Sequence, residues 1–82
     1  MIDLEIEILG LVSHSGELLM KEIVAKMANV DRDTVKDCVM TMVQSGLVRM
    51  KEDSYEHDWA YRITGLGRER LGQSGQEHDV GR

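Results

Sequence analysis

The side chains best suited to nucleophilic or metal chemistry in this chain are one cysteine, Cys38, and three histidines. A metal site needs several such ligands at short spacing, and a reactive thiol needs a second cysteine or a basic neighbour. The histidines lie far apart along the chain, at His14, His57 and His78. Cys38 has no basic residue at helical spacing. We therefore expect a packed thiol and no metal site.

Catalytic residue sets of other kinds are also missing from the sequence. It contains no Ser-His-Asp or Cys-His arrangement on defined elements, no glycine-rich loop after a strand, and no carboxylate pair in a plausible cleft. A chain of 82 residues also offers few walls that could exclude water from a reaction. We expect neither enzymatic activity nor a cofactor.

The length and composition predict one small globular domain. The 82 residues are 41% hydrophobic and 30% charged and include no proline. The net charge is -5, and no segment is a basic tail or patch of the kind that marks nucleic-acid-binding proteins. The apolar runs are far shorter than the ~20 residues that a membrane-spanning helix needs. Because the N-terminal segment is acidic, it does not suit a secretory signal, and we expect a cytoplasmic protein with no membrane partner.

The N-terminal segment, residues 1–13, fits two structures. From Ile2 to Ile8, apolar residues alternate with acidic ones, as in a half-buried strand. On a helix, however, Leu4, Ile8 and Val12 fall on one apolar stripe. We prefer the helix, because Glu and Leu favour it and because a lone N-terminal strand would need a sheet that the remaining sequence hardly supplies.

Two further helices follow. Residues 18–28 carry apolar side chains at helical spacing and predict the second helix. The third is predicted over residues 32–45, where Asp31 would accept hydrogen bonds from the first-turn amides and Gly46 would end the helix. Its inward-facing stripe consists of Val35, Val39 and Met42.

The pattern then changes to a period of two over residues 47–51 and 59–64, which predicts a β-hairpin with an acidic tip. One face of the hairpin is apolar and the other is basic. The aromatic and aliphatic residues expected to pack it onto the helices are Trp59, Tyr61 and Ile63. Thr64 can cap a short helix over residues 65–71, and we expect residues 72–82 to be a flexible tail.

These elements predict a mainly α domain over residues 1–71 with one small β-hairpin, in the order α-α-α-β-β-α. This order resembles the winged helix-turn-helix domain of small transcription regulators in the MarR, PadR and ArsR-like grouping. Residues 21–27, Lys-Glu-Ile-Val-Ala-Lys-Met, look like the first motif helix of that family. Residues 30–35, Val-Asp-Arg-Asp-Thr-Val, look like the turn that enters its recognition helix.

The second half of the chain carries the rest of the resemblance. Two core residues lead into Gly-Leu-Val at residues 46–48. Tyr-Arg-Ile-Thr at residues 61–64, followed by Gly-Arg-Glu at residues 67–69, is similar to the segment that follows the wing in the family. The resemblance covers about residues 4–71 and depends on the ordered set of motifs, since no single motif is specific.

The resemblance implies binding to double-stranded DNA, with helix 32–45 in the major groove and the wing, residues 47–64, on the phosphate backbone. The helix contacts that it implies are at Arg32, Thr34 and Lys36, and the wing contacts are at Arg49, Lys51 and Arg62. Asp33 and Asp37 lie on the same helix, and the wing tip is acidic. Both groups of carboxylates would repel a phosphate backbone.

The acidic wing also fits a second function, a winged helix that binds another protein in place of DNA. In this alternative, Tyr55 and Glu56 at the wing and the apolar N-terminal segment would contact the partner. Many members of the family dimerise through long helices outside the winged domain. If this chain forms a homodimer, its surface would come from residues 2–12 or 65–71.

Overall fold

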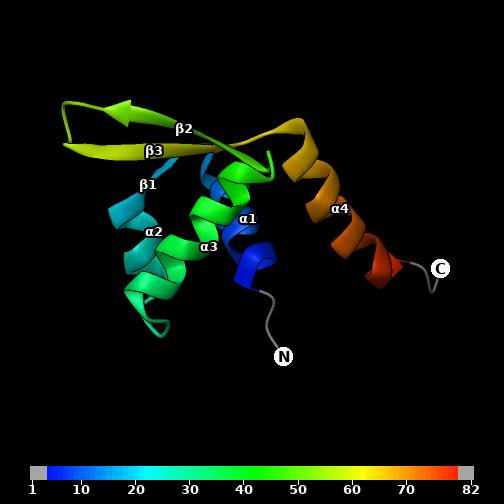
Figure 1. The fold of residues 1–82 in the computed structure, drawn as a ribbon. Helices are drawn as coiled ribbons and strands as arrows, with labels where there is room; N and C mark the ends of the chain where they lie inside the picture. The colour runs from blue at the N-terminus through cyan, green and yellow to red at the C-terminus, as the bar shows by residue number, and fades with distance from the viewer. Residues whose placement is uncertain (1–3, 80–82) are drawn as a thin grey trace.

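In the computed structural model, the chain folds into four helices and a small antiparallel sheet, and the structure describes residues 4–79. For residues 73–79 it describes the backbone alone. The elements, in chain order, are α1 (Leu4–Ser15), β1 (Leu18–Leu19), α2 (Met20–Lys26), α3 (Arg32–Gln44), β2 (Val48–Asp53), β3 (Asp58–Ile63) and α4 (Gly65–Asp79). The sheet lies over α1, α2 and α3, the β2–β3 hairpin extends to one side, and α4 leaves on the other (Figure 1). No helix in the described part of the chain is long and apolar enough to span a membrane. The predicted fold class, mainly helical with a small hairpin wing, is confirmed.

The N-terminal segment is the helix α1, and the alternative of a strand is wrong. Ile8, Leu9 and Val12 are buried at its inner face, where α1 packs against α3, α4 and β3. The helical stripe therefore determines the structure, and the alternation of acidic and apolar residues does not. Glu5 and Glu7 lie in the first turn, where negative charge favours a helix.

The segment after α1 differs from the prediction of one helix over residues 18–28. Gly16 has a positive φ of 85° and turns the chain, so that Leu18 pairs with Tyr61 and Leu19 with Ala60 of β3. Only after this short strand does α2 begin. The hairpin therefore becomes two strands of a three-stranded sheet in the order β1-β3-β2. Burial of Leu18 against the core outweighs its preference for a helix.

Helix α3 begins and ends where its capping residues predict. One carboxylate oxygen of Asp31 accepts hydrogen bonds from the backbone N–H of Asp33 at 3.1 Å and of Thr34 at 3.3 Å. Gly46 has a φ of 79° and follows the end of the helix. The inward stripe of Val35, Val39 and Met42 is buried, as expected.

The hairpin has the two faces that its sequence predicts. Val48, Tyr61 and Ile63 are buried on the inner face, whereas the basic residues of the outer face are exposed.

Trp59 is an exception to this burial of the inner face. It follows the alternation of Tyr61 and Ile63, but it is 44% exposed and, unlike them, is not part of the buried core. The reason is its place near the tip of the hairpin, at one end of the sheet (Figure 1).

The end of α3, the start of β2 and the start of α4 meet at Thr64. Its hydroxyl lies 2.5 Å from the carbonyl oxygen of Gly46 and 3.0 Å from that of Leu47, and it accepts a hydrogen bond from Gly67 N at 3.0 Å. The predicted capping role of Thr64 is thus confirmed. Because Gly67 lies directly on the Leu47 carbonyl, an added Cβ would overlap that oxygen.

Helix α4 is longer than the predicted residues 65–71, since it runs to Asp79. An ion pair of 2.8 Å between Arg70 Nη2 and Glu5 Oε1 joins it to α1. The flexibility expected for residues 72–82 stays a prediction, and residues 80–82 lie outside the described part of the chain.

Candidate nucleic-acid interface

The predicted contact residues of α3 lie at its exposed N-terminal end, on two different flanks. Arg32 and Lys36 are one turn apart and share one flank, whereas helical periodicity puts Thr34 on the opposite one. All three side chains are exposed. Asp33 and Asp37 lie between these two flanks and point most directly away from the core. The exposed surface of α3 is therefore cationic on one flank and acidic along its middle.

Arg32 and Lys36 face a groove of about 400 Å³ between the helix-turn-helix and the wing tip. We call this the tip groove; its lining consists of Met20, Lys21, Val24, Arg32, Lys36, Glu56, His57 and Asp58. Three cationic side chains thus meet two carboxylates of the wing tip. The electrostatic character of this surface is mixed.

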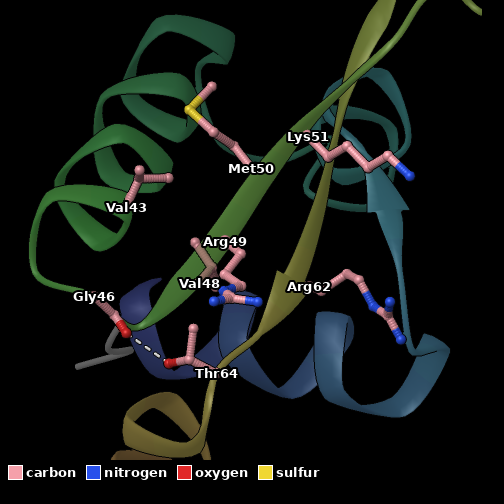
Figure 2. Close-up of a pocket in the computed structure, with 8 residues that line it drawn as sticks. All are labelled: Val43, Gly46, Val48, Arg49, Met50, Lys51, Arg62 and Thr64. Carbon is pink, nitrogen blue, oxygen red and sulfur yellow. Dashed lines mark hydrogen bonds between the residues drawn. The ribbon is translucent and has the colours of Figure 1, made fainter.

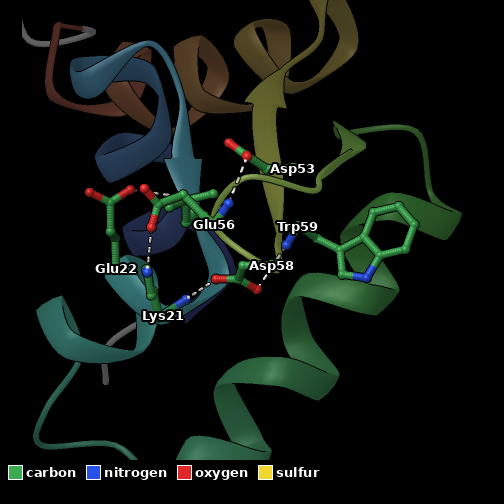
Figure 3. Close-up of polar contacts among 7 residues, drawn as sticks. Lys21, Glu22, Asp53, Glu56, Asp58 and Trp59 are labelled. Atoms are coloured by element: carbon green, nitrogen blue, oxygen red, sulfur yellow. Dashed lines mark hydrogen bonds and ion pairs between the residues drawn. The ribbon is translucent and has the colours of Figure 1, made fainter.

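Lys21 joins the wing tip to α2 (Figure 3). Its Nζ lies 2.7 Å from Glu56 Oε1, and its backbone N–H donates to Asp58 Oδ2 at 3.0 Å. The hydrogen bond to Glu56 and the charge of that carboxylate raise the pKa of Lys21 above 10.5. The carboxylates therefore hold Lys21 in its charged form and neutralise a cation that could otherwise meet phosphate.

The wing tip is also held by hydrogen bonds within itself. Asp53 Oδ1 accepts from Glu56 N at 3.1 Å, and Asp58 Oδ1 accepts from Trp59 N at 2.8 Å. His57, between the two carboxylates that contact Lys21, has a positive φ of 55°. The conformation of the turn thus directs Glu56 and Asp58 toward α2 (Figure 3).

The basic residues of the wing lie on its outer face. Arg49 pairs in register with Arg62, and Lys51 pairs with Ala60, so two like charges stand directly opposite each other. The nearest carboxylate to Arg62 is that of Glu17, with an Nε–Oε1 distance of 3.9 Å. Positive charge is therefore concentrated on this face.

These residues line a second groove, of about 690 Å³, beside β2 (Figure 2). We call it the β2 groove; its lining consists of Val43, Gly46, Val48, Arg49, Met50, Lys51, Arg62 and Thr64. The structure thus brings Arg32 and Lys36 together, and it brings the three basic wing residues together. The two sets lie in separate grooves.

Tyr55 and Glu56, the two residues proposed for binding another protein, differ in their surroundings. Tyr55 is 89% exposed at the wing tip, whereas Glu56 is paired with Lys21. The pairing had no local signal in the sequence, since Lys21 lies 35 residues from Glu56 and 37 from Asp58. Only the three-dimensional fold brings these three residues together.

The described side chains form no cluster of metal ligands, and Cys38 lies in a packed environment. Among residues 4–72, whose side chains the structure describes, no group of three or more His, Cys, Asp or Glu side chains could hold a metal ion. Cys38 is half-buried, and its Sγ lies 3.8 Å from the Sδ of Met42. This is the packed environment predicted for that thiol.

Comparison with known proteins gives a match to a solved structure. No protein-family model and no curated protein sequence matches this chain. Among solved structures, the chain is similar to a cysteine-to-serine mutant of MarR from E. coli, with a TM-score of 0.81 and 16% sequence identity. The match covers 93% of this chain and 56% of the MarR chain. The resemblance to a MarR-like winged helix, predicted from the order of motifs, is confirmed at the level of fold.

Proposed function

We propose that this chain is a winged-helix DNA-binding module of a transcription regulator and has no enzymatic activity of its own. The observation that carries the proposal is the pair Arg32 and Lys36, exposed one turn apart at the start of α3 in a MarR-like fold. In such folds the second motif helix enters the major groove. The partner is double-stranded DNA, and we place the protein in the cytoplasm.

The two flanks of α3 suit a helix that lies inside a groove. The major groove is about 12 Å wide, so both sides of an inserted helix face its walls. Arg32 and Lys36 would bind phosphates of one strand, and Thr34 would face the other strand. Asp33 and Asp37 would then point at base edges, where a carboxylate accepts a hydrogen bond from the amino group of cytosine.

The wing would add contacts from its outer face. Arg49, Lys51 and Arg62 are exposed there, and we propose that they bind the backbone beside the major groove. The carboxylates of Glu56 and Asp58 oppose this contact at the tip. We therefore expect modest affinity that is strongest at low salt.

The test is a selection from random duplexes, followed by fluorescence anisotropy of the full chain with the selected duplex over a range of salt concentrations. If about five phosphates are neutralised, log affinity falls with log salt at a slope of roughly -4 to -5. Arg32→Gln and Lys36→Gln should each weaken binding and reduce this slope by about one. Arg68→Gln, which removes an exposed cation of α4, is the matched control.

The outcomes of this test are distinct. Absence of binding to any duplex at low salt would reject the module as a DNA-binding unit. Binding that Arg32→Gln and Arg68→Gln weaken equally would reject α3 as the contact surface.

A second candidate function is the binding of another protein through the wing tip. It is favoured by Tyr55, whose side chain is 89% exposed, and by the neighbouring Trp59, at 44%. Large exposed aromatic side chains are typical anchors of protein interfaces. If Tyr55→Ala abolished function in cells while Arg32→Gln left it intact, this second function would replace the first.

For self-association, we propose residues 65–71 over residues 2–12. Ile8, Leu9 and Val12 are already buried within one copy of the chain, whereas Leu66 is 52% exposed. Measuring the solution mass of the wild type and of Leu66→Glu tests this surface, because a monomeric wild type would reject it.

A further inference from the structure

We infer that the β2 groove is a docking site for an extended peptide in which acidic and apolar residues alternate, and that this peptide adds to β2 as a fourth strand of the sheet. The inference goes beyond the proposed function, because it concerns a peptide ligand and not DNA. It follows from the sheet order, from the lining of the groove and from the charge of the outer face.

The first argument is the position of β2 at the edge of the sheet. The order β1-β3-β2 leaves β2 with one strand partner, β3, within the described part of the chain. Its outer edge therefore presents N–H and C=O groups over six residues, Val48–Asp53. An extended peptide can pair with such an edge through main-chain hydrogen bonds.

The second argument is that the edge is accompanied by an apolar wall. Met50 points from β2 toward α3, where Val43 faces it across the groove (Figure 2). Both side chains are half-buried, so each keeps apolar surface that a ligand could cover. In an added strand, every second side chain would lie on this inner side and would need to be apolar.

The third argument is the charge on the opposite side of the same strand. Arg49 and Arg62 stand directly opposite each other, an arrangement of like charges that destabilises a sheet. Glu17 Oε1 lies 3.9 Å from Arg62 Nε. No carboxylate among the described residues lies within 4.0 Å of a charged nitrogen of Arg49 or Lys51. The remaining side chains of an added strand would lie beside these cations, and Asp or Glu at those positions would neutralise them.

These arguments select a peptide over a nucleic acid for the apolar part of the groove. A sugar-phosphate chain could pair with Arg49 and Lys51, but it would leave the Val43 and Met50 wall and the strand edge without matching groups. A peptide of alternating character matches the edge, the wall and the cations together. Because Arg49, Lys51 and Arg62 are also the proposed wing contacts to DNA, peptide and duplex would compete for this face.

The test uses the full chain and a fluorescein-labelled peptide of about eight residues that alternates Glu and Val. Anisotropy should give affinity about tenfold higher for this peptide than for its counterpart with Gln in place of Glu. In amide NMR spectra, the largest changes should fall on Val43 and on residues 48–53. A Glu-Val peptide with N-methylated alternate amides keeps its charge but cannot extend the sheet, so it should lose most of the affinity.

Variants of the chain localise the binding. Lys51→Gln should weaken the Glu-Val peptide several-fold, while Arg68→Gln, an exposed charge on α4, should not. Arg32→Gln should weaken duplex binding and leave peptide affinity unchanged. Peptide binding can therefore be confirmed even if the chain does not bind DNA.

Three outcomes would overturn the inference. The first is equal binding of the Glu, Gln and N-methylated peptides, and the second is NMR changes at another surface. The third is self-association of the chain through β2, which would assign the groove to a second copy. A chain that binds the duplex but none of the three peptides is a case of the first outcome; it would reject the docking site and leave the DNA-binding proposal standing.

Discussion

Lys21 Nζ lies 2.7 Å from Glu56 Oε1, so a residue in the first turn of α2 holds the tip of the wing. The contact crosses the tip groove, in which Arg32 and Lys36 also lie. The cationic flank of α3 and the acidic wing tip therefore share one surface. Any polyanion that approaches α3 at this point meets both.

The acidic tip should reduce affinity for DNA. The double variant Glu56→Gln with Asp58→Asn removes two negative charges and the ion pair with Lys21. The amide oxygens can still accept hydrogen bonds, including the one from the backbone N–H of Lys21. We expect duplex binding to become about fivefold tighter at low salt, with a smaller gain at high salt. Anisotropy titrations measure this change, and Glu69→Gln, exposed on α4, is the control. Equal affinity of the double variant and the control would contradict the prediction.

The cap of α3 should make a measurable contribution to stability. Asp31→Ala removes the acceptor for two first-turn amides and should lower the free energy of unfolding by about 1 kcal/mol. Asp31→Asn keeps a side-chain oxygen at the same position and should stay close to the wild type. Urea denaturation of the three proteins compares them. If alanine and asparagine had the same effect, the loss would come from charge and not from the hydrogen bonds.

Two glycines of α4 should respond to alanine in opposite directions. At Gly67 an added Cβ overlaps the Leu47 carbonyl, so Gly67→Ala should destabilise the fold by about 1–3 kcal/mol. At Gly72 nothing lies within 4 Å of an added Cβ, so Gly72→Ala should stabilise it by about 0.5–1 kcal/mol. Thermal unfolding followed by circular dichroism measures both. A destabilised Gly72→Ala would mean that α4 is not helical there in solution.

Alkaline pH should reveal the environment of Tyr61. Burial, and secondarily the charge of Asp58, raise the pKa of its phenol above 10.0. The unfolded chain therefore loses this proton first, and the contribution to stability, complete below pH 10.0, falls as pH rises through the raised pKa. In Tyr55→Phe, Tyr61 is the one tyrosine left, and its absorbance can be titrated alone. A titration that was the same with and without urea would refute this environment.

Local signals in the sequence were sufficient for much of the fold. The Asp31 cap, the positive φ at Gly46 and the Thr64 cap each depend on residues a few positions away, and all three are found as predicted. The stripe of Leu4, Ile8 and Val12 likewise predicts the helix α1, in which Ile8 and Val12 are buried. The predicted clusters of basic residues exist as exposed groups, although the sequence did not separate them into two grooves.

The features that the sequence did not reveal depend on distant contacts. Leu18 and Leu19 form a strand because β3, about forty residues later, offers an edge. Lys21 binds the wing tip for the same reason. Trp59 shows a different limit, since the alternation predicts its face but not that its side chain stays 44% exposed near the start of β3. Periodicity predicts which face of a helix or strand a side chain lies on, whereas the residues that it contacts depend on the tertiary fold.

The junction at Thr64 and Gly67 has a consequence for any assembly built on this chain. The first turn of α4 is hydrogen-bonded to the end of α3 through Thr64, and Arg70 fixes a later turn to α1. These contacts fix the direction in which the first turns of α4, as far as Arg70, leave the domain. Two copies joined through these turns would hold their α3 helices at a constant separation, and that separation would determine how far apart two half-sites on a duplex must lie.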